Sequence, residues 1–155
     1  MKTKYRCING FILKMIAILT MLVDHTGAVL FPDQMIFRYI GRIAFPIFVF
    51  LIVEGFYHTR SIRKYEIRLL IFALISEIPF DLAFRGHILE FSYQNVFFTL
   101  FLGLVMLDVI RIVRMKSLLA GTAAEILVLV LFIFAAYLLK TDYDAGGILL
   151  IYVFY

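Results

Sequence analysis

The feature that most restricts the fold of this chain is a series of six apolar stretches within 155 residues, five of them long and the last one short. A membrane-spanning helix needs about 20 predominantly apolar residues. The last stretch has only ten residues and reaches about 15 Å, roughly half of the hydrocarbon core. We therefore expect an all-α, polytopic membrane bundle with five full transmembrane helices and an incomplete sixth. The stretches are 11–31, 37–56, 67–84, 95–110, 118–139 and 146–155.

Composition supports a membrane protein and excludes other classes. Hydrophobic residues make up 64% of the chain and charged residues 17%, against about 45–50% and 25% in soluble proteins. The net charge of +4 does not indicate nucleic acid, because the cations lie in short clusters between apolar stretches. Cys7 is the only cysteine, which excludes an intramolecular disulfide and a cysteine-based zinc site. We predict neither a metal site nor a nucleic-acid partner.

The Lys and Arg residues between the stretches predict the orientation, since cytoplasmic loops are enriched in them. Ten fall on one side of the membrane and three on the other, which places the N-terminus in the cytoplasm. The ten are Lys2, Lys4, Arg6, Arg60, Arg63, Lys64, Arg68, Arg111, Arg114 and Lys116, and the three are Arg38, Arg85 and Lys140.

The chain has no low-complexity linker and no visible internal repeat. We expect one transmembrane domain over residues 1–155, as the N-terminal part of a longer bundle. Pro46 and Pro79 fall inside apolar stretches. Proline removes a helical hydrogen bond and clashes with the preceding turn, so we expect kinks at both.

Ionisable side chains inside apolar stretches are the strongest functional signal, because each costs about 2.5–3.5 kcal/mol at a helix centre. Five of them are expected at similar depth, from near mid-membrane to the outer end: Asp24, His25, Arg42, Glu77 and Asp81. We predict that they converge on an outward-facing polar pocket and form the candidate catalytic set. The candidate substrate-binding residues are Gln94, Asn95, Asp142 and Tyr143 at the outer side and Glu54 nearer the cytoplasm.

Spacing adds geometry to these candidates. Lys14 and His25 are eleven residues apart, almost three helical turns, so they share a helix face and lie about 16 Å apart along the axis. Glu77 and Asp81 are four residues apart and share a face. Two such carboxylates repel each other unless a proton or a cation such as Arg42 lies between them. The shared face of Lys14 and His25 and the pair of carboxylates both suit proton transfer. His25 can exchange protons near neutral pH, and Asp24 or Asp81 would orient its ring.

Structural interpretations stand beside these functional ones. His25 is equally explained as a hydrogen-bonded interior histidine, and Arg42 as half of a structural ion pair. Lys14 can extend its ammonium group to the inner interface. Glu54 and Asp108, near the cytoplasmic ends, can neutralise the basic loops.

Several strings resemble the TraX family, named for a bacterial inner-membrane protein that acetylates the N-terminus of conjugative pilin. They are Val-Asp-His-Thr-Gly at 23–27, Ile-Gly-Arg-Ile-Ala-Phe-Pro-Ile-Phe at 40–48, Val-Glu-Gly-Phe at 53–56, Phe-Ala-Leu-Ile-Ser-Glu-Ile-Pro-Phe-Asp at 72–81, Gln-Asn-Val-Phe-Phe-Thr-Leu at 94–100 and Thr-Asp-Tyr at 141–143. The resemblance covers residues 14–155. Asp144 departs from it, since glycine is expected there, and family members continue for several more spans.

TraX-like proteins are in turn distantly similar to transmembrane acyltransferases, whose first motif has a basic residue, ten intervening residues and a histidine. Lys14 and His25 match that spacing. The resemblance implies that His25 is the catalytic base, that Asp24 is its partner and that Lys14 serves an acyl-CoA donor.

The expected function is therefore an integral-membrane acyltransferase in the bacterial inner membrane. It would use acetyl-CoA as donor and an amine or hydroxyl as acceptor, on a pilin-like protein or a glycan. Two alternatives remain open from the residues alone. Charged residues inside helices also mark proton-coupled transporters, and polar pairs that only set helix register would suit an assembly scaffold.

Overall fold

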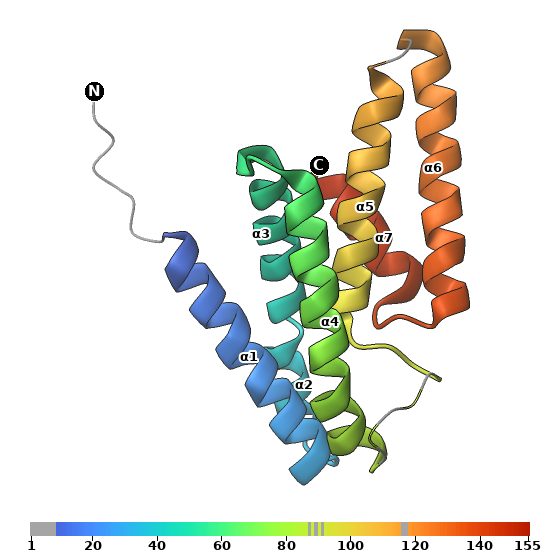
Figure 1. The fold of residues 1–155 in the computed structure, drawn as a ribbon. Helices are drawn as coiled ribbons and strands as arrows, with labels where there is room; N and C mark the ends of the chain where they lie inside the picture. The colour runs from blue at the N-terminus through green and yellow to red at the C-terminus, as the bar shows by residue number, and fades with distance from the viewer. Residues whose placement is uncertain (1–8, 87, 89, 91, 116–117) are drawn as a thin grey trace, which may run out of the picture. The chain divides into compact units, whose positions relative to one another are not determined.

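The computed structural model describes residues 9–86, 88, 90, 92–115 and 118–155 of the chain. Lys2, Lys4, Arg6, Cys7 and Lys116 lie outside these residues. The described residues form seven α-helices and no strand, as expected for an all-α protein (Figure 1). The helices are α1 (Gly10–Leu30), α2 (Met35–Gly41), α3 (Ala44–His58), α4 (Ile62–Arg85), α5 (Val96–Arg114), α6 (Leu118–Leu139) and α7 (Asp144–Phe154).

The helix lengths agree with a polytopic membrane protein. Among the described residues, four segments are long and apolar enough to cross a bilayer: Gly10–Leu30, Met35–His58, Val96–Arg114 and Gly121–Leu139. The apolar helix α7 is shorter, as the sequence predicted for the sixth stretch. Helix α4 covers the third predicted span but carries Arg68, Glu77 and Asp81 within it. That α4 crosses the membrane stays a prediction.

The chain divides into two compact units, Met1–Leu51 and Ile52–Tyr155. The first unit contains α1, α2 and the start of α3, and the second contains the end of α3 and the helices from α4 to α7. The single-domain organisation stays a prediction.

The second predicted span is interrupted rather than kinked. Helix α2 ends at Gly41, Arg42 and Ile43 form a turn, and α3 starts at Ala44. Pro46 explains the break, because its ring would clash with the carbonyl four residues earlier, that of Arg42, in a continuous helix. Pro46 then occupies the first turn of α3, where a missing N–H costs little. Pro79, in contrast, lies inside α4 as expected.

In the first unit, α1 and α2 pack closely because two glycines leave room between them. A Cβ atom at Gly27 would overlap the Cβ of Phe37, and one at Gly41 would overlap Asp24. The rings of Phe31 and Phe37 stack beside this contact with centroids 5.5 Å apart. Small residues at helix crossings allow the close backbone approach on which helix association in membranes depends.

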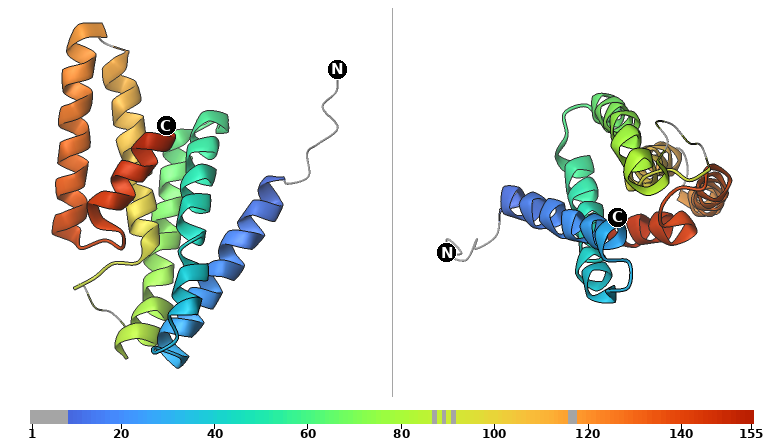
Figure 2. Two further views of the ribbon diagram at one scale, coloured as in Figure 1. Left: turned by 180° about the vertical axis from the view of Figure 1, so that it is seen from behind. Right: turned by 90° about the horizontal axis from the view of Figure 1, so that it is seen from below.

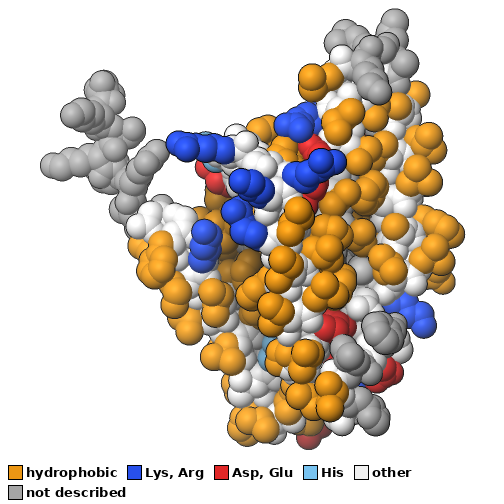
Figure 3. All heavy atoms as spheres, viewed as in Figure 1, with side chains coloured by type: hydrophobic (Ala, Val, Ile, Leu, Met, Phe, Trp, Pro, Cys, Tyr) orange, Lys and Arg blue, Asp and Glu red, His pale blue; other side chains and the backbone are white. Residues whose placement is uncertain are grey.

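In the second unit, α5 is the central helix and contacts α4, α6 and α7 (Figure 2). Its buried residues recur at the helical spacing of three and four: Val96, Thr99, Leu100, Gly103, Leu104, Met106, Leu107 and Ile110. Gly103 admits the side chain of Ile151 from α7, with which a Cβ atom would collide. Helix α6, in contrast, exposes large apolar side chains such as Leu127, Leu131 and Phe134. Such a surface suits contact with lipid, and apolar side chains cover much of the visible face (Figure 3).

Candidate functional site

The candidates fall into both units. Lys14, Asp24, His25 and Arg42 belong to the first, and Glu54, Glu77, Asp81, Gln94, Asn95, Asp142 and Tyr143 belong to the second. The predicted convergence of all five catalytic candidates therefore stays a prediction, and the geometry below concerns each unit separately.

In the first unit, Asp24 on α1 forms an ion pair with Arg38 on α2. The Arg38 Nη1 to Asp24 Oδ2 distance is 3.0 Å, and the two side chains are partly buried. Gly41 lies against the same carboxylate and brings α2 close enough for the pair to form. The cation that holds Asp24 is thus Arg38, one of the three cations expected on the outer side.

The other candidates of this unit lie on the same two elements. Lys14 and His25 both belong to the uninterrupted helix α1, as their predicted common face requires. Lys14 is exposed, whereas His25 is partly buried. Arg42 is exposed and caps the C-terminal end of α2, where its backbone N–H donates to the Arg38 carbonyl at 3.0 Å. Its predicted role beside carboxylates stays a prediction.

In the second unit, Glu77 and Asn95 form a buried polar contact between α4 and the start of α5. Glu77 is 4% exposed and Asn95 is 3% exposed. The Glu77 Oε2 atom accepts hydrogen bonds from the backbone N–H of Asn95 at 3.2 Å and from its side-chain amide. That amide also donates to the Ala73 carbonyl at 3.0 Å, while the Asn95 Oδ1 atom caps α5 by accepting from the Phe97 N–H at 2.9 Å. Asn95 therefore fixes Glu77 and the start of α5 together.

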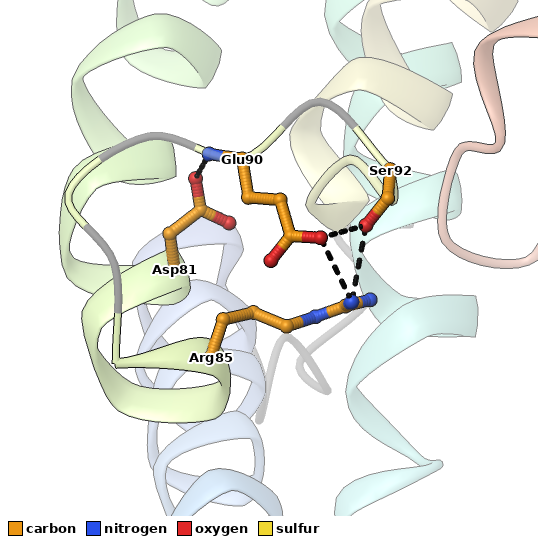
Figure 4. Close-up of polar contacts among 4 residues, drawn as sticks. All are labelled: Asp81, Arg85, Glu90 and Ser92. Carbon is orange, nitrogen blue, oxygen red and sulfur yellow. Dashed lines mark hydrogen bonds and ion pairs between the residues drawn. The ribbon is translucent and has the colours of Figure 1, made fainter.

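Asp81 lies one turn further along α4 and is 1% exposed. Its Oδ2 atom accepts a hydrogen bond from the backbone N–H of Glu90 at 2.7 Å (Figure 4). The Glu90 carboxylate is held in turn by Arg85 at 3.4 Å and by the Ser92 hydroxyl. Arg85 also donates to Ser92 Oγ at 3.0 Å. These contacts hold Glu90 and Ser92 against the end of α4.

Gln94 and Asp142 come from two loops that pair through their backbones. The Gln94 N–H donates to the Lys140 carbonyl at 3.0 Å, and the Asp142 N–H donates to the Gln94 carbonyl at 2.9 Å. The Thr99 hydroxyl donates to the Asp142 carbonyl, and the Tyr93 hydroxyl donates to Asp142 Oδ1 at 2.6 Å. The structure thus brings Gln94 and Asp142 together beside α5. That this cluster faces outward and binds a substrate stays a prediction.

Two tyrosines lie beside Asp142 in this cluster, one in the chain and one through a hydrogen bond. Tyr143, next to Asp142, caps the start of α7 with a positive φ of 67°. Burial raises the pKa of Tyr93 well above its usual value, and the hydrogen bond and the charge of Asp142 add to this effect. Tyr93 therefore remains a protonated donor at physiological pH.

Three buried oxygen atoms of this unit have no hydrogen-bond partner among the described residues. They are Glu77 Oε1, Asp81 Oδ1 and Thr141 Oγ1. A buried acceptor without a donor costs about 1–3 kcal/mol, and more when it is charged. Two carboxylate oxygens can be satisfied by a bound proton or by an N–H or O–H group of a ligand. Glu77 and Asp81 are therefore equipped to receive a hydrogen-bond donor.

Glu54 lies apart from this cluster, on the last turns of α3. Its carboxylate is 3.5 Å from His58 Nδ1, and both side chains are largely exposed. This arrangement is typical of an i, i+4 surface pair, which contributes little to stability. The predicted role of Glu54 in substrate binding stays a prediction.

Sequence reasoning missed several residues that hold these candidates in place: Arg38, Ser76, Tyr93, Thr99, Arg85, Glu90 and Ser92. For Arg38 a signal was present, because an arginine fourteen residues after Asp24 follows a short loop and a helix start. For Tyr93 and Thr99 there was none, since their partner is more than forty residues away. In the part of the chain that the structure describes, no group of three His, Cys, Asp or Glu residues is placed to hold a metal ion.

Comparison with known proteins assigns the chain to a family. The family model described as TraX protein matches residues 9–155. The probable fimbrial assembly protein FimC, serogroup H1, of Dichelobacter nodosus is 38% identical over 111 residues, which are 64% of this chain and 45% of that protein. An uncharacterized protein of Rickettsia prowazekii (strain Madrid E) is 33% identical over 102 residues, 66% of this chain and 36% of that protein. No solved structure matches.

The chain spans less than half the length of these two curated relatives. The family match, in contrast, begins at the residue before α1 and extends to the end of α7. It includes every candidate residue described above. The chain therefore belongs to the TraX family.

Proposed function

We propose that this chain is part of an acetyl-CoA-dependent acyltransferase of the bacterial inner membrane. The acceptor would be an amine or hydroxyl on a pilin-like protein or a glycan. Membership in the TraX family supports this proposal, as does a relative named for fimbrial assembly. The structural observation that carries it is the position of His25, one residue after the ion-paired Asp24 on an uninterrupted α1.

In the proposed reaction, His25 takes the proton from the acceptor N–H or O–H as that atom attacks the thioester carbonyl. A C–N or C–O bond forms, the C–S bond breaks, and the imidazolium returns its proton to the leaving thiolate. Histidine suits both steps because its pKa lies near neutrality. Lys14 would serve the donor, and Arg42 would stabilise the negative charge that develops on the carbonyl oxygen.

The structure suggests a particular role for Asp24. Consecutive side chains on a helix point about 100° apart, and Asp24 is already paired with Arg38. We therefore assign Asp24 as a positioning residue that holds α2 against α1 next to His25. Its proposed effect on the imidazolium is electrostatic rather than a direct hydrogen bond.

The second unit would bind the acceptor. Glu77 and Asp81 each keep one buried oxygen that has no donor among the described residues, and an amine or hydroxyl supplies such donors. An ammonium group would also neutralise the carboxylates, whereas a hydroxyl would not. Gln94, Asn95, Asp142 and Tyr143 would form the surroundings of the acceptor, since their loops are joined beside α5.

The test is transfer of labelled acetyl groups from acetyl-CoA to an acceptor by the full-length protein in lipid, with His25→Ala compared with His58→Ala. His58 is exposed and belongs to no candidate set, so its variant controls for loss of a histidine. We expect a loss of about 100-fold or more for His25→Ala, the usual contribution of a general base, and little change for His58→Ala. Equal activity in both variants would rule out His25 as the base. Ion-coupled uptake that His25→Ala abolishes, without acetyl transfer, would instead indicate a carrier.

A further inference from the structure

A pocket of about 490 Å³ lies in the second unit, at the end of the unit where α3 leads into α4. Its walls come from the end of α3, the turn before α4, the first residues of α4 and the end of α5. The volume is within the usual range of about 300–1,000 Å³ for small-molecule sites. Arg60 in the turn before α4, Arg63 and Lys64 at the start of α4 and Arg111 near the end of α5 are among the cations that predict the cytoplasmic side. None of the candidate site residues described above lines this pocket.

The pocket has an excess of positive charge. Arg60, Arg63 and Arg111 line it, against a single lining carboxylate, Asp108. Asp108 forms an ion pair with Arg111 at 2.7 Å, and no carboxylate of the described residues lies within ion-pair distance of Arg60 or Arg63. Lys and Arg side chains gather over the N-terminal end of α4 (Figure 3). Two guanidinium groups therefore remain available for an anion.

Glu66, one turn into α4, is the other acidic group nearby. Burial raises the pKa of its carboxyl, as does the charge of Asp108, while Arg63 and Arg111 lower it. Even with Glu66 fully charged, the cations outnumber the carboxylates around the pocket.

The start of α4 adds to the positive potential instead of balancing it. A helix N-terminus carries a partial positive charge that usually attracts Asp or Glu. The first turn of α4 has no acidic residue and contains Arg63 and Lys64. Ser61 caps the helix by accepting from the Lys64 N–H at 3.4 Å. An anion in the pocket would be favoured by both the helix end and the arginines.

The opposite part of the pocket is aromatic. Phe56, Tyr57 and Tyr155 line it, and the rings of Tyr57 and Tyr155 are stacked with centroids 5.8 Å apart. The Tyr57 hydroxyl donates to the Tyr155 carbonyl at 2.9 Å, which holds the two together. Aromatic side chains bind flat rings by stacking. A ligand with both a planar ring and phosphates would match both parts of the pocket.

We propose that this pocket binds a nucleotide polyphosphate from the cytoplasm, with its phosphates on Arg60 and Arg63 and its base against the exposed ring of Tyr57. A phospholipid headgroup shares the phosphate chemistry but lacks the flat ring. If the nucleotide is the adenosine diphosphate portion of coenzyme A, the pocket holds the acyl donor, and that identification rests on the proposed function. Arg60 and Arg63 would then contact the donor phosphates.

The test is equilibrium binding of labelled ADP and of free coenzyme A to the full-length protein in nanodiscs of phosphatidylcholine. The variant is Arg60→Gln/Arg63→Gln, whose side chains are exposed and make no described ion pair. The matched control is Lys64→Gln/Arg68→Gln, which removes the same charge from the same region outside the pocket lining. We expect the Kd of ADP to rise about tenfold or more in the pocket variant, as for lost charge-assisted hydrogen bonds. In the control variant the Kd of ADP should rise less than about threefold.

Three results would overturn the proposal. The first is no saturable ADP binding, and the second is an equal loss of affinity in the control variant, which would indicate only a general surface charge. The third is loss of ADP binding when the protein is placed in nanodiscs that contain phosphatidylglycerol. That loss would assign the pocket to lipid headgroups. ADP carries no acyl group, so its binding does not depend on catalysis. Normal ADP binding by a protein without acetyl transfer would contradict only the proposed function, and His25-dependent transfer without nucleotide binding by the pocket would contradict only this inference.

Discussion

At the scale of single residues, the second unit depends on Asn95. Its side chain and backbone make hydrogen bonds to Glu77 and Ala73 and cap α5 at the same time. Glu77 is buried, so loss of the Asn95 amide removes one of its two described donors and leaves the backbone N–H of residue 95 as the other. Asn95 is therefore expected to matter for stability before any role in binding is considered.

We predict that Asn95→Ala lowers the free energy of unfolding by about 1–3 kcal/mol, the cost of an unsatisfied buried acceptor. Thermal or denaturant unfolding in detergent micelles measures this change. Combining Asn95→Ala with Glu77→Leu should cost less than the sum of the single variants, because the second substitution removes the carboxylate that has lost its amide donor. Additive effects would show that the two side chains are not coupled.

Tyr93 provides a prediction about pH. The pKa of Tyr93 is raised in the folded protein by burial and by Asp142, relative to about 10 in the unfolded chain. Its contribution to stability is therefore complete below about pH 10 and is lost as the pH rises above that value. Tyr93→Phe should cost about 1 kcal/mol at pH 7, the net value of one hydrogen bond. It should also make unfolding less sensitive to pH above 10, and an unchanged alkaline slope would contradict this account.

At the scale of helices, close packing and polar pairs fix how neighbours meet. Arg114 at the end of α5 donates to both carboxylate oxygens of the buried Glu125 on α6, at 2.8 and 2.7 Å. Tyr152 of α7 donates to the same carboxylate at 2.9 Å. This contact joins three helices at one end of the second unit. In the first unit, Gly41 and the ion pair of Asp24 serve the same purpose.

Gly41→Ala is predicted to destabilise the contact between α1 and α2 by about 1–3 kcal/mol, as for other overpacked sites. The new Cβ would overlap the Asp24 side chain and separate it from Arg38. Thermal unfolding of the purified protein is the measurement. Gly10→Ala is the control, since no atom lies within 4 Å of a Cβ at that position. Equal stability of the two variants would mean that α2 can move away from α1 without a loss of folding free energy.

At the scale of the whole molecule, the distribution of cations predicts that the α3–α4 turn faces the cytoplasm and the segment after α4 faces outward. Both of these predicted orientations require α4 to cross the membrane despite its charged residues. Cys7 is the only native cysteine, so a Cys7→Ser background allows single cysteines to report the side.

In that background, a membrane-impermeant maleimide should label Ile88→Cys in spheroplasts and label Lys64→Cys only after the membrane is permeabilised. Both positions are exposed. Labelling of both residues before permeabilisation would show that α4 does not cross. Labelling in the reverse order would invert the predicted orientation.

The sequence by itself determined that this is a helical membrane protein. The length and apolarity of each stretch are local properties, and they decide whether that stretch can span a bilayer as a helix. It also placed Lys14 and His25 on one helix and Asn95 at the start of another. Only the tertiary structure decided that Arg38 pairs with Asp24, that Pro46 interrupts a span, and that Tyr93 meets Asp142. Partner choice depends on how helices and loops are placed against one another, and the spacing of residues along one helix does not contain that information.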